Sequence, residues 1–275
     1  MKARPHRTGF RRISRPSLIL LFSLVVAAAC DLPSATERRI DAVWFRHSLV
    51  EGHLSHWLQA APTPQGRFRF NADRNWRAKE ENVADLTAQA RFVYVMAAGY
   101  ELTGDSRYLD QVKAGADFML TRMHDPEFGG FFDRVSPEGK VLYPGKQSYG
   151  NAFAIFGLAH AYRATGDVRY LDAAMDNWRV VKRHLWDPGG GLAPATSQDF
   201  SRREGVNTQN PMMHLFEALL ALYDASGSTL ILGGRSPGGG FRGAPVVCRR
   251  RLWWLYTGIL RRRLEAAANG QRWIR

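Results

Sequence analysis

The sequence of 275 residues is poor in cysteine, and its two cysteines, Cys30 and Cys248, stand far apart in the chain. Neither belongs to a Cys/His spacing that would build a zinc site. The glycine-rich segments also lack the pattern of a phosphate-binding loop. We therefore expect neither a metal ion nor a nucleotide as cofactor.

Acidic residues are nearly missing from both ends of the chain. Residues 1–30 hold six Lys and Arg and no acid, and residues 228–275 hold ten Arg against one Glu. The two ends together carry a charge of +15. Since the net charge of the whole chain is +13, residues 31–227 carry a charge of about −2. Neither end interleaves its arginines with a motif that reads DNA or RNA. The sequence therefore predicts no nucleic-acid partner.

The apolar run near the start of the chain, residues 17–26, is too short to span a membrane as a stable helix. It follows basic residues and precedes Ala27-Ala28-Ala29, which is the order of a secretory signal peptide. Because Cys30 comes directly after these small residues, the segment resembles a bacterial lipobox, with Cys30 as the lipidated first residue of the mature protein. The alternative is ordinary secretion with cleavage near the alanines. We expect an exported protein, periplasmic or held to the membrane by its lipid anchor alone.

An internal repeat with a period near 62 residues organises the middle of the chain. Residues 90–110 align with residues 152–172, and both contain Tyr-x-x-Thr-Gly-Asp followed by Arg-Tyr-Leu-Asp. Each unit reads as a helix, a Thr-Gly turn, a second helix and a glycine-rich loop, and an amphipathic helix is predicted before them over residues 40–60. Such hairpins must stack or close into a ring to bury their faces. The sequence predicts an all-α fold, a partial (α/α) barrel in which inner helices alternate with outer ones.

A third unit begins near Asn210, which is predicted to cap a helix with Pro211 in the first helical position. His214 then lies one turn further along the same face. The repeat offsets place two sets of residues at equivalent positions of the three successive inner helices, and residues at equivalent positions of a ring share one height. These sets are Arg91, Phe153 and His214, and Gln89, Asn151 and Met212.

The repeat breaks after Gly227. Residues 228–275 are rich in Arg and Gly where an outer helix is due, as if translated in another frame or joined as a foreign tail. We expect three segments: a signal peptide with its lipobox over residues 1–30, a partial barrel domain over residues 31–227, and an off-pattern tail over residues 228–275.

His214 and Arg91 are the candidates for chemistry, and each has a structural alternative. His214 either serves a substrate or is held by Glu217 in the first turn of its helix. Arg91 stands in an apolar segment, so its guanidinium either pairs with a core carboxylate such as Glu217 or is reserved for a negatively charging substrate oxygen. Tyr149 and Asn151 add a phenol and an amide to the same rim, or only polarity at the start of a helix.

Three motifs in order resemble the N-acylglucosamine 2-epimerase superfamily, which includes cellobiose 2-epimerases and mannose isomerases. They are Gly129-Gly130-Phe131-Phe132, the segment from Lys146 to Ile155, and the segment from Asn210 to Ala218. The resemblance covers about residues 40–227 and implies an (α/α)6 barrel.

The resemblance also implies base-catalysed chemistry at C2 of an open-chain aldose. A histidine removes the C2 proton, and an arginine, here Arg91, stabilises the enediolate in a water-poor cavity. Proton return to the opposite face gives epimerisation, and proton return to C1 gives a ketose. By the same resemblance, Asn210 and His214 match sugar-contacting positions, with His214 assisting ring opening. Gln89, Tyr149, Asn151 and Phe153 are further candidate sugar contacts.

The sequence departs from the family in its histidines. The two acid/base histidines of the family come from later inner helices, and this sequence has no histidine after His214. We therefore expect a truncated and inactive polypeptide. Two other functions stay open: a glycoside hydrolase of an (α/α) barrel class, such as unsaturated glucuronyl hydrolases, which would need a pair of Asp side chains facing the cavity, and a noncatalytic carbohydrate-binding remnant.

Overall fold

A computed structural model describes residues 41–187, 191–228 and 231, and the chain divides into two compact units, residues 1–48 and residues 49–275. In the first unit the described residues belong almost entirely to α2 (Ala42–Leu49), in which Trp44 and Phe45 meet edge to face. The predicted signal peptide with Cys30 lies outside the described residues, as does the predicted tail apart from Ser228 and Ile231.

The second unit is built from helical hairpins at the predicted spacing. It opens with two helical segments, η1 (Val50–Leu54) and α3 (Ser55–Ala60). The first hairpin is α4 (Leu86–Thr103) and α5 (Ser106–Phe118), and the second is α6 (Ser148–Thr165) and α7 (Val168–Val180). A π-helical turn follows each outer helix, η2 (Met119–Met123) after α5 and η3 (Val181–Leu185) after α7. The last described helix, α8 (Gln209–Ser226), occupies the place of a third inner helix.

Three glycines end the inner helices in the same way. Gly104, Gly166 and Gly227 have φ values of 71°, 73° and 65°, the left-handed conformation that closes a helix at little steric cost for glycine. The backbone N–H of each donates to the carbonyl of the tyrosine four residues earlier. In the two complete hairpins the next aspartate, Asp105 or Asp167, caps the outer helix. The predicted Thr-Gly-Asp turns are therefore confirmed.

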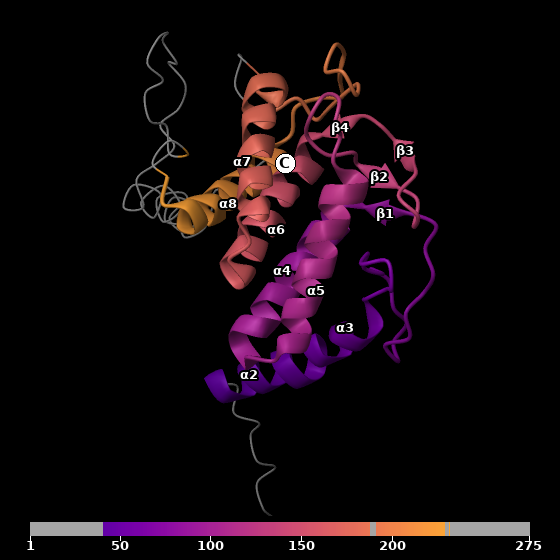
Figure 1. Cartoon of the computed structure of the whole chain (residues 1–275), viewed down its shortest axis with the longest axis vertical. Coiled ribbons are helices and arrows are strands. Elements are labelled where there is room, and N and C mark those ends of the chain that lie inside the picture. The colour runs from indigo at the N-terminus through magenta and orange to yellow at the C-terminus, as the bar shows by residue number, and fades with distance from the viewer. Residues whose placement is uncertain (1–40, 188–190, 229–230, 232–275) are drawn as a thin grey trace, which may run out of the picture. The chain divides into compact units, whose positions relative to one another are not determined.

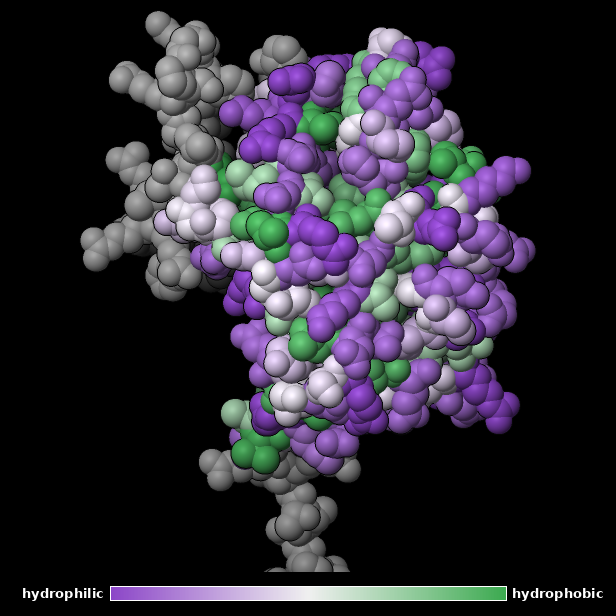
Figure 2. Space-filling view, viewed as in Figure 1, coloured by the Kyte–Doolittle hydropathy of each residue, from purple (hydrophilic) through white to green (hydrophobic). Residues whose placement is uncertain are grey.

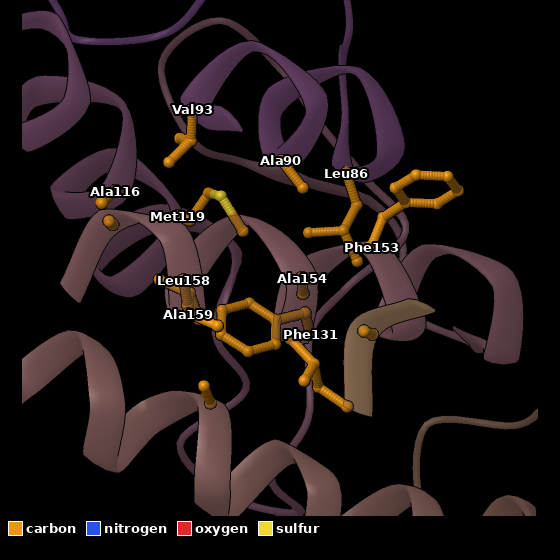
Figure 3. Packing of buried hydrophobic residues seen from close by; sticks show 14 of the residues in the cluster. Leu86, Ala90, Val93, Ala116, Met119, Phe131, Phe153, Ala154, Leu158 and Ala159 are labelled. Carbon is orange, nitrogen blue, oxygen red and sulfur yellow. The ribbon is translucent and has the colours of Figure 1, made fainter. Parts of the chain in front are cut away.

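The helices form an inner and an outer row. In the inner row α6 packs between α4 and α8, while α5 packs on α4 and α6, and α7 packs on α6 and α8 (Figure 1). Figure 3 shows Leu86, Ala90 and Val93 of α4 turned toward α6. The inner helices approach closely at Gly157 of α6, where an added Cβ would lie 2.7 Å from the carbonyl oxygen of Ala90. The prediction of alternating inner and outer helices is confirmed.

Short strands, which the sequence did not predict, order the loops at one end of the inner helices. One antiparallel sheet joins β1 (Ala84–Asp85), β2 (Arg134–Val135) and β3 (Val141–Tyr143). Its repeat equivalent joins β4 (Lys146–Gln147), β5 (Ala195–Thr196) and β6 (Arg203–Glu204). Since β1 and β4 lead directly into α4 and α6, the sheets fix where these helices begin.

Within the described part of the chain, no helix is long and apolar enough to cross a membrane. On the face of the molecule shown in Figure 2, hydrophobic residues are interspersed with hydrophilic ones.

Candidate functional site

Three side chains predicted to share one height, those of Arg91, Phe153 and His214, lie together on the inner helices, and Tyr149 of the predicted rim joins them. The Arg91 Nη2 atom of α4 donates to the Tyr149 hydroxyl of α6 at 2.9 Å, and the guanidinium carbon lies 4.2 Å from the centre of the Phe153 ring. The His214 ring of α8 lies 4.6 Å from the Phe153 ring and 5.0 Å from the Tyr149 ring, centre to centre. We call Arg91, Tyr149, Phe153 and His214 the inner cluster.

Arg91 is exposed, although its apolar neighbours in sequence suggested a buried guanidinium. The helical spacing explains the difference, because Phe92 and Val93 turn into the core while Arg91 and Tyr94 lie on the open face of α4. No carboxylate of the described residues forms an ion pair with Arg91, and the proposed pairing with Glu217 is absent. The guanidinium therefore keeps donors available in front of an aromatic platform.

Glu217 instead holds His214. The Nδ1 atom of His214 lies 2.9 Å from a Glu217 carboxylate oxygen, one turn along α8. The imidazole retains 16% exposure and the Glu217 side chain 51%. A carboxylate at Nδ1 fixes the ring orientation and leaves Nε2 as the nitrogen that can act on another group. The contact between His214 and Glu217 that the sequence suggested is thus present. It leaves Nε2 available, so it is compatible with a role of His214 in contacting a substrate.

Gln89 and Asn151 do not join the inner cluster. The side-chain amide of Gln89 accepts from the backbone N–H of Phe68 at 2.7 Å and donates to the carbonyl of the same residue at 2.9 Å. In the same way, the Asn151 amide accepts from the backbone N–H of Phe131 at 3.0 Å and donates to the carbonyl of Phe131 at 3.3 Å. Both amides are buried, so the structure assigns them to anchoring the loops that precede α4 and α6 rather than to an open surface.

The capping prediction for Asn210 is wrong. The residue before α8 is Thr208, with extended backbone and no side-chain cap, and the helix starts at Gln209. Pro211 is then the third helical residue, where a missing N–H still leaves no intrahelical bond unmade. Asn210 is exposed in the first turn of α8, one turn before His214. Its predicted sugar contact stays a prediction.

A second group of rings lies one turn further along the same helices and was not predicted from the sequence. Tyr94 of α4, together with Phe156 and His160 of α6, forms a mutual contact with ring centres 4.6–4.8 Å apart. Burial, assisted by the charge of Arg163, lowers the pKa of His160 to about 4, so its imidazole is neutral at pH 7. The spacing Phe153, Phe156, His160 on one helical face could have revealed this group.

Lys146 of β4, which directly precedes α6, forms a buried ion pair with Asp125. The Lys146 Nζ atom lies 2.6 Å from Asp125 Oδ2 and 4.1 Å from the centre of the Phe132 ring, and the two charged side chains are 0% and 1% exposed. Burial opposes ionisation of Asp125, but Lys146 and the N–H groups of Glu127 and Phe128 together hold its pKa below the ordinary value. Asp125 thus caps the turn that follows it, and Lys146 balances its charge.

Asp187 stands one repeat after Asp125 and contacts Asn207 and Arg203. Its Oδ2 atom accepts from the Asn207 amide at 3.0 Å and lies 3.8 Å from the Arg203 guanidinium. Neither aspartate therefore resembles a free catalytic carboxylate, and the pair needed for glycoside hydrolysis is not formed by them. Among the described residues, no group of three or more His, Cys, Asp or Glu side chains gathers as a metal site.

Among the described residues, Asp133 is the carboxylate whose pKa is raised above its ordinary value. It is 3% exposed and accepts from the Gln147 amide at 3.0 Å. Burial and the nearby charge of Asp85 raise its pKa to about 6, although Arg134 at 3.4 Å opposes the shift. The folded protein therefore binds this proton more tightly than the unfolded chain, and the contribution of Asp133 to stability declines as the pH rises from about 4 to about 6.

Asp133→Asn is expected to stabilise the protein at neutral pH, because the amide can still accept from Gln147 without carrying a buried charge. The pKa difference corresponds to about 2–3 kcal/mol of unfolding free energy at pH 7.5, and the gain should fade toward pH 4. Urea denaturation of both proteins at these two pH values measures it. An equal difference at both pH values would contradict the titration of Asp133 as its source.

Comparison with known proteins places this helical array in a family. Residues 66–231 match the family model described as N-acylglucosamine 2-epimerase (GlcNAc 2-epimerase). The chain is 30% identical over 186 residues to the cellobiose 2-epimerase of Eubacterium cellulosolvens, covering 64% of this chain and 46% of that protein. It is 32% identical over 178 residues to the D-mannose isomerase of Thermobifida fusca, covering 63% of this chain and 42% of that protein.

A solved structure shares the fold. The cellobiose 2-epimerase of Bacillus thermoamylovorans superposes with a TM-score of 0.63 at 20% identity, over 70% of this chain and 52% of that one. The array of hairpins is therefore part of an (α/α)6 barrel fold, as predicted. The chain spans about half the length of these relatives or less.

Proposed function

This chain belongs to the N-acylglucosamine 2-epimerase family, and from that premise we propose that its inner cluster binds an open-chain aldose and serves chemistry at the C2 carbon through an enediolate. The observation that carries the proposal is the meeting of Arg91 of α4 and His214 of α8 on the Tyr149 and Phe153 rings of α6. A sugar lying over these rings would have a cation on one side and an imidazole on the other.

Arg91 supplies the charge that this chemistry needs. Removal of the C2 proton places negative charge on the oxygens at C1 and C2, and a guanidinium can donate to both at once. Tyr149 accepts one of its N–H groups and Phe153 supports its plane, so two neighbours restrict where the guanidinium points. Because no carboxylate of the described residues pairs with it, binding an anionic oxygen breaks no ion pair.

His214 supplies an imidazole whose Nδ1 is held by Glu217. We propose that Nε2 contacts the sugar and assists opening of its ring, since an imidazole can both accept and donate a proton near neutral pH. Inversion at C2 requires proton transfer on both faces of a planar enediolate. The inner cluster contains one imidazole, so we expect the 275-residue polypeptide by itself to bind sugar without turning it over.

Two measurements test this proposal. An aldonohydroxamate, whose ionised form is a planar mimic of the enediolate, should bind wild type, and Arg91→Met should weaken binding by about 10- to 100-fold through the loss of a charged hydrogen-bond donor. Isothermal titration calorimetry gives the affinities. Arg107→Met is the matched control, because Arg107 is an exposed arginine in the first turn of α5 that pairs only with Asp105 among the described residues.

Unchanged hydroxamate affinity in Arg91→Met would exclude the inner cluster as the sugar site. Turnover is followed separately as exchange of the C2 hydrogen of mannose, N-acetylmannosamine and cellobiose in deuterated water. Exchange above background would contradict the expected inactivity of the polypeptide and would favour an enzyme over a noncatalytic sugar-binding protein. Export and lipidation at Cys30 stay predictions of the sequence.

A further inference from the structure

A cavity of about 550 Å³ lies at the first sheet, apart from the inner cluster. Its walls are Phe70, Val83, Asp85, Arg134, Leu142 and Tyr143. This volume is in the range of small-molecule sites, and the cavity is lined by both apolar and hydrogen-bonding side chains, as such sites are. We call it the sheet cavity.

The polar side of the sheet cavity is a row across three strands. Asp85 of β1 is paired in register with Arg134 of β2, and Arg134 is paired in register with Tyr143 of β3. Residues directly opposite each other in an antiparallel ladder point to the same face of the sheet. A carboxylate, a guanidinium and a phenol therefore stand side by side on one face, and all three line the cavity.

The second sheet shows that this row is not a requirement of the repeat. The equivalent register there joins Gln147, Ala195 and Glu204. An alanine takes the place of the central arginine, and an amide takes the place of the first carboxylate. A row of polar side chains needed only to hold the hairpin loops would be expected in both sheets. Because it occurs in the first sheet and not at the equivalent register of the second, holding the loops does not explain it.

The charges of the row favour a neutral ligand. The Arg134 Nε atom lies 3.4 Å from Asp133 and 3.9 Å from Asp85, so its charge is already balanced by carboxylates. An anion would meet these carboxylates, and a cation would meet the guanidinium. Arg134 is 55% exposed, which leaves donors free at the cavity surface. A ligand with neighbouring hydroxyl groups can accept from Arg134 and donate to Asp85 together.

The remaining walls are suited to the C–H face of a pyranose ring. Phe70 and Tyr143 offer aromatic surface, and Leu142 is 50% exposed despite being apolar. We propose that the sheet cavity is a binding site for a neutral saccharide residue, held by Asp85 and Arg134 through its hydroxyls and by Tyr143 through its ring face. This site requires no chemistry at C2 and does not depend on the function proposed for the inner cluster.

The test uses methyl β-D-glucopyranoside, whose ring cannot open, so that it cannot follow the open-chain chemistry proposed above. Saturation-transfer NMR should detect its binding to wild type in the presence of the aldonohydroxamate. Arg134→Met and Tyr143→Ala should each weaken binding by about 10-fold, as expected for loss of a charged hydrogen bond or an aromatic face. Arg107→Met is again the matched control, because Arg107 is an exposed arginine whose ion pair with Asp105 involves no residue of the sheet cavity.

Circular dichroism of each variant shows that the fold is kept. The proposal is overturned by the absence of saturation transfer to wild type, by binding that survives both Arg134→Met and Tyr143→Ala, or by galacturonate binding more tightly than the neutral glycoside. Loss of glycoside binding in Arg91→Met alone would likewise assign the sugar to the inner cluster. A wild type that binds the glycoside but not the hydroxamate would leave this site standing and remove the function proposed for the inner cluster.

Discussion

Lys146→Met is expected to lower the free energy of unfolding by about 3–5 kcal/mol, the usual loss when one partner of a buried ion pair is removed. The methionine fills a similar volume, so the loss arises from Asp125, which remains 1% exposed and has lost its counter-charge. Urea denaturation at pH 7.5 measures the change. The loss should shrink toward pH 4, since a protonated Asp125 no longer needs a cation.

Two further variants test the origin of this effect. Lys140→Met changes an exposed lysine in the loop before β3 and should alter stability by less than about 0.5 kcal/mol. Adding Asp125→Asn to Lys146→Met should recover part of the loss, because an amide can still accept from the N–H groups of Glu127 and Phe128. A double variant less stable than Lys146→Met would show that the uncompensated carboxylate is not the cause.

Gly157→Val is expected to destabilise the protein by about 3 kcal/mol or more, because the new side chain meets backbone rather than flexible side-chain ends. The carbonyl oxygen, Cα and carbonyl carbon of Ala90 lie 2.7, 3.0 and 3.2 Å from an added Cβ. Helices α4 and α6 would have to move apart. Since Arg91 follows Ala90 directly, the contact between Arg91 and Tyr149 should loosen as well.

Gly150→Ala provides the control on the same helix. Its added Cβ would meet the side-chain ends of Leu86 and Asp133 at 3.2 and 3.3 Å, which can yield by small rotations. Its effect should stay within about 1 kcal/mol. Thermal unfolding followed by circular dichroism ranks the two variants, and hydroxamate affinity reports the geometry of the inner cluster. Equal stability of Gly157→Val and wild type would mean that the inner helices are not packed backbone to backbone.

The repeat made the helices and much of the inner cluster predictable from sequence. Gly104 and Gly166 mark helix ends in both units, and their spacing fixes the register between α4 and α6. That register alone places Arg91 and Phe153 at one height. The prediction holds because helix periodicity and helix ends are local properties, which a single sequence displays directly.

Contacts that depend on the folding of loops could not be predicted in this way. The sequence presents Gln89 and Asn151 as polar groups next to Arg91 and Phe153, and nothing local shows that their amides meet loop backbone. Lys146 and Asp125 stand 21 residues apart, and only the closing of the loop between them creates their ion pair. The exposure of Arg91 depends on which face of α4 the neighbouring helices cover.

The paired hydrogen bonds of the Gln89 and Asn151 amides also affect local unfolding of the loops in the native state. Gln89 of α4 binds the backbone of Phe68, and Asn151 of α6 binds the backbone of Phe131. Met212, at the equivalent position of α8, has no side-chain amide with which to bind Leu192, the residue one repeat after Phe131. The first two loops can detach only together with a buried hydrogen-bonding group of a helix. The loop before α8 has no such hydrogen bonds from a side-chain amide of its helix. Its backbone amides should therefore exchange with deuterium faster than those of the other two loops, through local opening that leaves the helices folded.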